Sequence, residues 1–154
     1  SILGKKSETT LPKENLGTYF IQIEQLEFAE LLSKHLETKI FKRSVESIVR
    51  AENICKKYPQ KIHKNIKKKD LLLVEEKKLY KILEPIINSK MEASWTPTKY
   101  IEKFLSIEPV VTSFFENVLV MDDDPLKCGN RLWLCQQLSN WSKKFLDLQA
   151  IVFP

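Results

Sequence analysis

The C-terminal part of the chain carries large apolar residues at the spacing of one helix face. They follow one another at steps of four, three, four, three and four positions: Leu134, Leu138, Trp141, Phe145, Leu148 and Val152. Residues at these steps lie on one side of an α-helix, and such a side has to be covered by other elements. The pattern therefore predicts a long final helix that supports the rest of the fold, with Trp141 in the core.

An acidic run marks the start of this helix. Asp122, Asp123 and Asp124 precede Pro125. An aspartate at the N-cap accepts hydrogen bonds from the first backbone N–H groups, and proline suits the first helical position. We expect the helix to begin at Pro125. Carboxylates are also ligands of Mg²⁺, but the helix start accounts for the run, and we expect no metal here.

Continued towards its start, the apolar stripe reaches two polar residues, Asn130 and Arg131. Polar groups on a core-facing stripe need hydrogen-bond partners. Residues 118–121 have to fold back near the helix start, so their backbone is a candidate partner. Two interpretations stay open: Asn130 and Arg131 clamp this turn, or Arg131 contacts RNA from the same place.

The rest of the chain has the composition of helices, with many Leu, Ile, Lys and Glu residues and only 3 Gly. Periodicity predicts helices over 16–37, 40–58 and 71–90, one that begins at Pro97 behind an N-cap at Thr96, and a short one opened by Pro109. The residues expected in the core are Phe41, Val45, Ile48, Val49 and Cys55, then Leu72, Leu79, Leu83, Ile86 and Ile87, then Tyr100, Ile101, Phe104 and Leu105. Together these elements predict an all-α bundle of five to six helices over residues 16–154, preceded by a linker or frayed terminus at 1–15.

The most basic segment lies between the second and third expected helices. Residues 56–69 contain Lys56, Lys57, Lys61, Lys64, Lys67, Lys68 and Lys69 and no acidic residue. A flexible loop of this kind binds phosphate without sequence specificity. The alternative is a linker that its lysines keep solvated. The net charge of +5 favours a polyanionic partner only weakly.

Several classes of chemistry are not indicated. The glycines stand at positions 4, 17 and 129, so the sequence has no glycine-rich phosphate loop. No nucleophile with a base is suggested, and we expect no catalytic residue. Cys55, Cys128 and Cys135 have no metal-ligand spacing and are expected to be reduced thiols. No apolar run has the length of a membrane span.

The residues around the start of the final helix carry a resemblance to a known family. The matching residues are Phe114, Phe115, Asn117, Val118, Val120, Met121, Asn130, Arg131 and Leu132. This order resembles the C-terminal end of the β subunit of bacterial-type glycyl-tRNA synthetase, an anticodon-binding domain of the DALR type. The signature tetrapeptide is Asp124-Pro125-Leu126-Lys127. Asp124 and Leu126 match it, while Pro125 and Lys127 depart from it.

The resemblance implies a fragment of a longer chain that recognises glycine tRNA beside an α subunit, in an α2β2 assembly. It places the ATP and Mg²⁺ of this class II ligase on the other subunit and implies no cofactor in this domain, which would be non-catalytic alone. The implied compartment is the cytoplasm, or the stroma of an organelle. The candidate RNA contacts are Arg131, Lys127, Arg50, Lys61, Lys64, Lys67, Lys68 and Lys69. Candidate structural motif residues are Asp124, Leu126, Asn130 and Asn117.

Two alternatives remain. The first is the related anticodon-binding domain of an arginyl-tRNA synthetase, against which the run from Phe114 to Met121 speaks. The second is a non-catalytic helical scaffold that docks onto protein. An apolar surface patch around Phe153 would favour docking, whereas a basic groove beside Arg131 would favour RNA.

Overall fold

The computed structural model describes residues 30, 33–35, 38–88 and 97–143. The expected linker at 1–15, the N-cap Thr96, and Phe145, Leu148, Val152 and Phe153 lie outside these residues. So does most of the helix expected over 16–37, although Glu30 and residues 33–35 are helical.

The described part of the chain is all-α. Its helices are α3 (Lys39–Lys57), α4 (Val74–Asn88), α5 (Pro97–Ser106), α6 (Glu108–Asn117) and α7 (Pro125–Lys143), with short 3-10 turns η2 (Pro59–Lys61) and η3 (Lys68–Asp70). No strand occurs in the ranges described above. The predicted helical fold is therefore confirmed, and the bounds of α3 lie within one residue of the expected 40–58. None of the helices described is long and apolar enough to cross a membrane.

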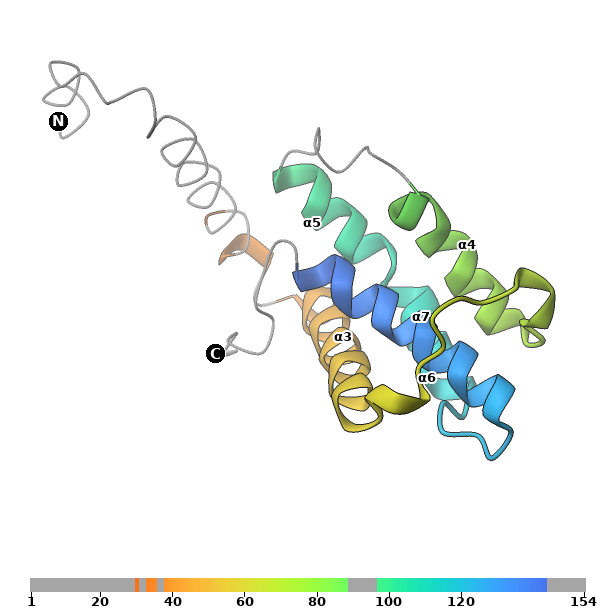
Figure 1. Cartoon of the computed structure of the whole chain (residues 1–154). Coiled ribbons are helices and arrows are strands. Elements are labelled where there is room, and N and C mark those ends of the chain that lie inside the picture. Colours follow the sequence, from red (N-terminus) through yellow and green to blue (C-terminus); the bar gives the residue numbers. More distant parts are fainter. Residues whose placement is uncertain (1–29, 31–32, 36–37, 89–96, 144–154) are drawn as a thin grey trace, which may run out of the picture.

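Helix α7 lies at the centre of the bundle. It packs between α3 and α4, while α6 contacts both of these helices and α5 contacts α3 and α6 (Figure 1). Leu134, Leu138 and Trp141 are buried as the stripe predicts, but Leu132 and Cys135 on other sides of α7 are buried too. A helix that is covered on several sides loses its amphipathic pattern. The single predicted stripe therefore underestimates how much of α7 is enclosed.

For two residues the predicted position in the core is wrong. Leu72 is 59% exposed and Ile87 is 40% exposed, whereas Leu71 is buried. The reason for the first is the start of α4, which begins at Val74, so residues 71–73 do not follow the helical frame assumed for them. The other expected core residues of α3 and α4, namely Phe41, Val45, Ile48, Cys55, Leu79, Leu83 and Ile86, are buried. Val49, Phe104 and Leu105 pack against the core as partly buried residues, and Tyr100 and Ile101 are buried.

The three cysteines are free and buried, as expected for reduced thiols. The Cys55 thiol donates to the backbone oxygen of Leu132 over 3.6 Å and so links α3 to α7. Burial raises the pKa of Cys55 to about 11, although the Lys143 ammonium acts in the opposite direction. Burial also raises the pKa of Cys135 well above its ordinary value.

Candidate nucleic-acid interface

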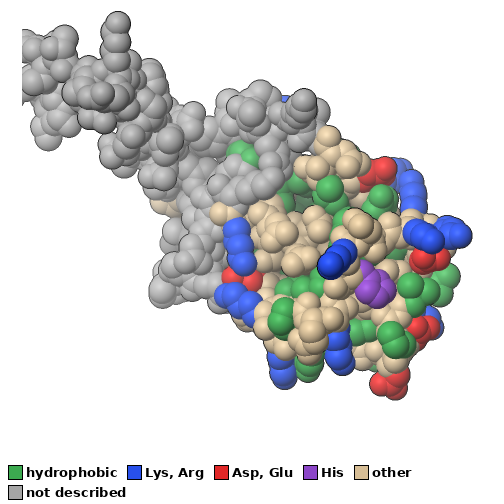
Figure 2. Space-filling model, in the orientation of Figure 1, with side chains coloured by type: hydrophobic (Ala, Val, Ile, Leu, Met, Phe, Trp, Pro, Cys, Tyr) green, Lys and Arg blue, Asp and Glu red, His purple; other side chains and the backbone are tan. Residues whose placement is uncertain are grey.

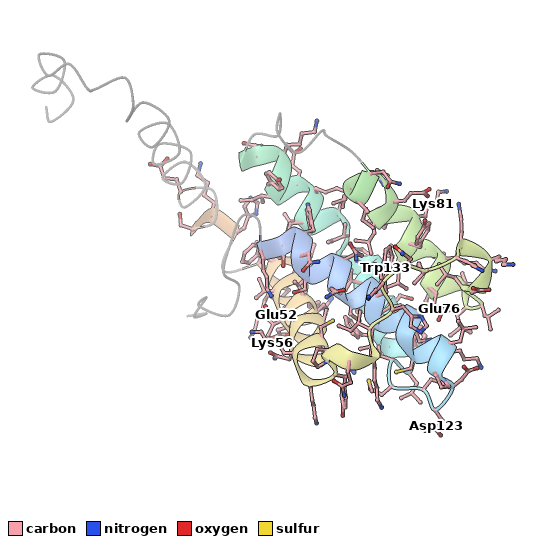
Figure 3. The ribbon with its side chains drawn as sticks, in the orientation of Figure 1. Glu52, Lys56, Glu76, Lys81, Asp123 and Trp133 are labelled. Atoms are coloured by element: carbon pink, nitrogen blue, oxygen red, sulfur yellow. The ribbon has the colours of Figure 1, made fainter. Side chains whose placement is uncertain are left out.

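The centre of the site is a buried ion pair between α4 and α7. Nε of Arg131 lies 2.6 Å from Oε1 of Glu76, and both side chains are almost fully buried. The other carboxylate oxygen of Glu76 accepts hydrogen bonds from the backbone N–H groups of Leu72 and Leu73, each at 2.8 Å. Glu76 thus caps the start of its own helix while it holds the cation of α7. Figure 3 shows Glu76 where α4 and α7 face each other.

Arg131 also holds the turn between α6 and α7. Its Nη1 donates to the backbone oxygen of Leu119 over 2.8 Å and to Oδ2 of Asp122 over 3.2 Å. The clamp interpretation of Arg131 is therefore confirmed. Because the guanidinium is buried and shared among three protein groups, direct contact with RNA would require this arrangement to open. The RNA contact assigned to Arg131 from the sequence stays a prediction.

Asn130 does not take part in this clamp, so that half of the interpretation is wrong. Its Oδ1 lies 2.9 Å from Nδ1 of His63, which comes from the segment between α3 and α4. Asn130 is 1% exposed, and its Nδ2 has no hydrogen-bond partner among the residues that the structure describes. The side chain faces the basic segment rather than residues 118–121.

Gly129 makes this contact with His63 possible. A Cβ built on Gly129 would collide with the His63 ring, so the imidazole occupies the space that any other side chain would need. The backbone N–H of His63 also donates to the oxygen of Gly129 over 3.4 Å. Glycine inside a helix costs about 1 kcal/mol relative to alanine. At this position the absence of a side chain allows another segment to approach α7 closely.

The basic segment has a defined path, which differs from the expected flexible loop. We call residues 59–73 the crossing segment, because they pass over α7 between α3 and α4 (Figure 1). Two short turns interrupt it, Ile62 and Ile66 pack against the core, and Leu71 is buried. The lysine ammonium of Lys61 lies 5.4 Å from the Tyr58 ring, and that of Lys68 lies 5.8 Å from the Tyr80 ring. The lysines are thus presented on a surface whose backbone is held.

The candidate cations are distributed rather than gathered. Lys61, Lys64, Lys67, Lys68, Lys69 and Arg50 are exposed, and Lys127 is half-buried. The Arg50 guanidinium lies 4.8 Å from the Phe115 ring, which ties it to α6. Figure 2 shows Lys and Arg side chains spaced around one face, with Asp and Glu side chains between some of them. The structure brings the crossing segment close to α7 but leaves Arg131 beneath the surface.

The signature residues shape the start of α7. Oδ1 of Asp124 accepts from the backbone N–H of Leu126 over 2.9 Å, which confirms Asp124 as the N-cap. The Leu126 side chain is 49% exposed. Asn117 donates to the backbone oxygen of Ser113 over 2.9 Å and closes the last turn of α6.

Asp122 belongs to the same turn. Its Oδ1 accepts from the backbone N–H of Asp124 over 2.9 Å. This hydrogen bond lowers the pKa of Asp122, and the Lys127 and Arg131 cations lower it further. The acidic run is therefore used by the turn and the helix start. Within the residues that the structure covers, no group of three His, Cys, Asp or Glu side chains is arranged to hold a metal ion.

An aromatic pair lies beside this region. Trp133 of α7 stacks on Tyr80 of α4 with ring centroids 6.2 Å apart, and both rings are partly buried. Figure 3 shows Trp133 on the side of α7 that faces α4. Trp141 is buried, as predicted.

Sequence reasoning missed His63 and Glu76. His63 pairs with a residue 67 positions away and Glu76 with one 55 positions away, so local patterns could not show either contact. Two weaker signals were present. Gly129 inside a helix indicates close approach of another segment, and a glutamate three residues after Leu73 has the spacing of a capping residue.

Comparison with known proteins decides the family. The family model described as the DALR anticodon binding domain matches residues 45–154, which is more than half of the chain. The chain belongs to this family. The DALR match begins within α3 and includes the crossing segment, α4 to α7 and the clamp around Arg131.

Two curated relatives of this DALR domain carry the same name. The chain is 31% identical over 138 residues to the glycine–tRNA ligase beta subunit of Streptococcus pneumoniae strain JJA. It is 30% identical over 138 residues to the glycine–tRNA ligase beta subunit of Streptococcus pneumoniae strain 70585. Each alignment covers 88% of this chain and 19% of the relative, so the chain spans about a fifth of the relatives' length. No solved structure matches the chain.

Proposed function

We propose that this domain recognises tRNA as the anticodon-binding part of a glycyl-tRNA synthetase β subunit. The observation that carries the proposal is the DALR match over residues 45–154, together with relatives named glycine–tRNA ligase beta subunit. These relatives favour the glycine enzyme over an arginyl-tRNA synthetase. The exposed lysines of the crossing segment supply the charge that a phosphate backbone requires.

The proposal extends to the whole enzyme. The partners are the glycine tRNA and the α subunit, in an α2β2 assembly that works in the cytoplasm or an organelle stroma. ATP and Mg²⁺ bind on the α subunit, and this domain contributes recognition without catalysis. Glycine-dependent pyrophosphate exchange by this chain alone would contradict the last point.

The lysines and the clamp have different roles in this proposal. Lys67, Lys68 and Lys69 are exposed. Among the residues that the structure describes, only Lys68 of these three forms an ion pair, with Nζ 3.9 Å from Oε2 of Glu84. We assign these lysines to phosphate contacts. Arg131 and Glu76 instead fix the α6–α7 turn and the start of α4, so they shape the surface that RNA meets.

The test is a salt titration of binding to glycine tRNA and to an unrelated tRNA. Replacing Lys67, Lys68 and Lys69 together by Gln should weaken binding of both tRNAs equally and flatten the dependence of log K on log salt. The matched control removes three charges at the opposite end of α3, at Lys39, Lys42 and Arg43, and should change binding little. Wild-type chain that binds neither tRNA at low salt would overturn the proposal.

A further inference from the structure

Most of the exposed apolar side chains belong to one end of the bundle. We call five of them, which are between 36% and 69% exposed, the apolar patch: Leu72, Leu73, Val74, Leu119 and Leu126. Among the residues that the structure describes, the other exposed large hydrophobic side chains are Ile40 and Ile87. Apolar side chains that lie together on a surface mark a contact site more often than single ones do.

The buried ion pair brings the two halves of the apolar patch together. Glu76 accepts from the backbone N–H groups of Leu72 and Leu73 at the start of α4, and its carboxylate pairs with Arg131 of α7. Arg131 donates in turn to the backbone oxygen of Leu119 over 2.8 Å. The start of α4 and the α6–α7 turn are therefore joined by two side chains in contact with each other.

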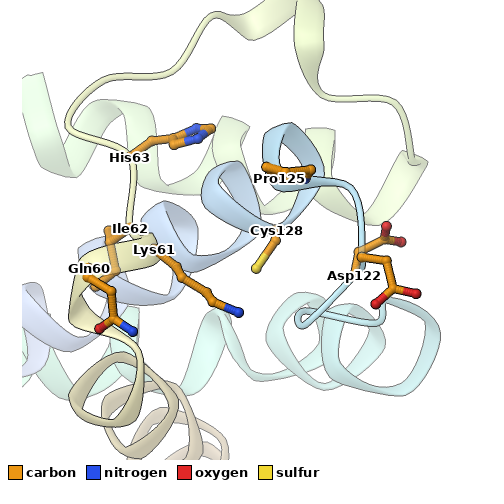
Figure 4. Close-up of a pocket in the computed structure, with 8 residues that line it drawn as sticks. Gln60, Lys61, Ile62, His63, Asp122, Pro125 and Cys128 are labelled. Carbon is orange, nitrogen blue, oxygen red and sulfur yellow. The ribbon is translucent and has the colours of Figure 1, made fainter.

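The same series of hydrogen bonds continues to Leu126. Asp122 accepts from Arg131 and from the backbone N–H of Asp124, and Asp124 accepts from the backbone N–H of Leu126. Figure 1 shows the start of α4 and the α6–α7 turn at the same end of the bundle. Figure 4, a close-up of the neighbouring cavity, shows Asp122 on the loop that enters α7 at Pro125. The segments that carry the apolar patch are thus fixed relative to one another.

This arrangement is informative because a buried ion pair is costly. Both charges lose their water, and an apolar pair of similar volume often stabilises a fold as well or better. Here Glu76 and Arg131 hold backbone segments whose side chains are exposed. A surface fixed in this way loses little freedom when it binds a partner, which favours affinity.

Charges of opposite sign border the apolar patch on its two sides. Lys77 and Lys78 are exposed and stand one helical turn after the α4 residues of the patch. Asp123 is exposed in the α6–α7 turn, whereas Glu75 and Lys127, which reverse the sign on each side, are partly buried. Within the described part of the chain, Lys77, Lys78 and Asp123 form no ion pair. The α4 side is therefore basic and the α7 side acidic.

We propose that the apolar patch binds a second copy of this chain in a two-fold symmetric dimer. A two-fold axis brings the same patch of both copies together, so the α4 side of one copy meets the α7 side of the other. The apolar side chains then cover one another, and Lys77 and Lys78 of each copy face Asp123 of the other. Phosphates of a nucleic acid would instead be repelled by the acidic side. Five apolar side chains make a small interface, which indicates a reversible dimer.

The experiment is sedimentation equilibrium of the full chain without RNA, at concentrations from about 1 μM to about 500 μM, which span weak association. The average mass should rise with concentration from that of one chain towards twice that value. Leu72→Gln together with Leu119→Gln should weaken the dimer about tenfold or more, because apolar residues at the centre of an interface carry most of the affinity.

Ile40→Gln together with Ile87→Gln is the matched control. These two side chains are exposed to a similar degree but do not belong to the apolar patch, so the dissociation constant should stay within about twofold of the wild-type value. Thermal melts check that each variant is folded, and substitutions at exposed sites are expected to change stability little.

Charge reversal tests the two-fold arrangement. Lys77→Glu with Lys78→Glu should weaken self-association, and so should Asp123→Lys, because each homodimer then places like charges opposite each other. An equimolar mixture of the two variants makes both symmetry-related contacts attractive again. This mixture should associate about as tightly as the wild-type chain.

Three results would overturn the inference. A chain that stays monomeric at every concentration would show that the apolar patch does not bind a second copy. Dimers that survive Leu72→Gln with Leu119→Gln, or that are weakened equally by the control pair, would place the interface elsewhere. A mixture of the charge variants that stays monomeric would rule out the two-fold pairing. None of these measurements contains RNA, so the proposed function is tested separately by its salt titration.

Discussion

Glu76 and Arg131 lie 55 positions apart in sequence and form a buried ion pair that joins α4 to α7. Through Glu76 the pair reaches the start of α4, and through Arg131 it reaches the turn before α7. One interaction thus fixes both segments beside the crossing segment. Its removal should therefore affect the candidate interface and the stability of the domain together.

Arg131→Met should lower the free energy of unfolding by about 3–5 kcal/mol, because it leaves the Glu76 carboxylate buried without a cation. The measurement is urea denaturation at neutral pH. The double variant Glu76→Gln with Arg131→Met should recover part of this loss, since no buried charge remains. Arg50→Met is the control at an exposed site and should cost no more than about 1 kcal/mol. An unchanged midpoint for Arg131→Met would contradict the burial of the pair.

The variant Arg131→Lys distinguishes a structural role of Arg131 from a direct contact between Arg131 and RNA. Lysine keeps the charge and loses the planar fork that serves Glu76, Leu119 and Asp122 at once. We expect a lower melting temperature, with tRNA affinity of the folded fraction close to that of wild type. A stable variant with much weaker tRNA binding would instead assign Arg131 a direct RNA contact.

Gly129→Ala should destabilise the domain although alanine favours helices. The added methyl collides with the His63 ring, and crowding of this kind costs about 1–3 kcal/mol. With His63→Ala present, the same change should become neutral or stabilising by up to about 1 kcal/mol. A thermodynamic cycle of the four chains checks this reversal of sign. Equal effects of Gly129→Ala with and without His63 would rule out the contact.

Stability should fall in acid partly through Asp122. The pKa of Asp122 is lowered from its ordinary value of 3.8, first by the hydrogen bond from the backbone of Asp124. A carboxyl with a lowered pKa in the folded state stabilises the fold above its unfolded pKa, and this contribution is lost as pH falls through the folded value. Asp122→Asn should therefore flatten the decline of the melting temperature below about pH 4. Asp123→Asn serves as the control, and an identical decline in both variants would argue against this role of Asp122.

Cys55 should react slowly with thiol reagents in the native state. With a pKa of about 11, only about one thiol in a thousand is ionised at pH 8, and the thiolate is the reactive form. Ellman's reagent should therefore modify the native chain far more slowly than the chain in urea. Cys55→Ser identifies the contribution of this thiol. Rapid native labelling that disappears in Cys55→Ser would show that Cys55 is accessible.

Local signals in the sequence were sufficient for most of the fold. The apolar spacing in α3 predicts its bounds, and Asp124 with Pro125 predicts the start of α7. The contact from Arg131 to Leu119 spans only 12 positions and follows from the turn. These features depend on residues that are neighbours in the chain, where spacing and capping preferences decide the conformation.

The remaining features depend on which segments meet in space. Nothing near Glu76 in the sequence shows that Arg131 will face it, and nothing near Asn130 shows that His63 will approach. The exposed position of Leu72 has the same origin, because Glu76 accepts its backbone N–H and the helix starts three residues later than apolar periodicity suggests.

The packing of the crossing segment on α7 also determines how fast a protease can cleave the folded chain. Lys61, Lys64, Lys67, Lys68 and Lys69 are exposed trypsin targets. Their backbone is held by the His63–Gly129 hydrogen bond and by the packing of Ile62 and Ile66, and cleavage requires the segment to leave α7. Local opening of this kind precedes global unfolding and sets the rate of cutting when closing is fast. The rate of the first tryptic cut among these lysines therefore measures how often the segment lifts from its helix.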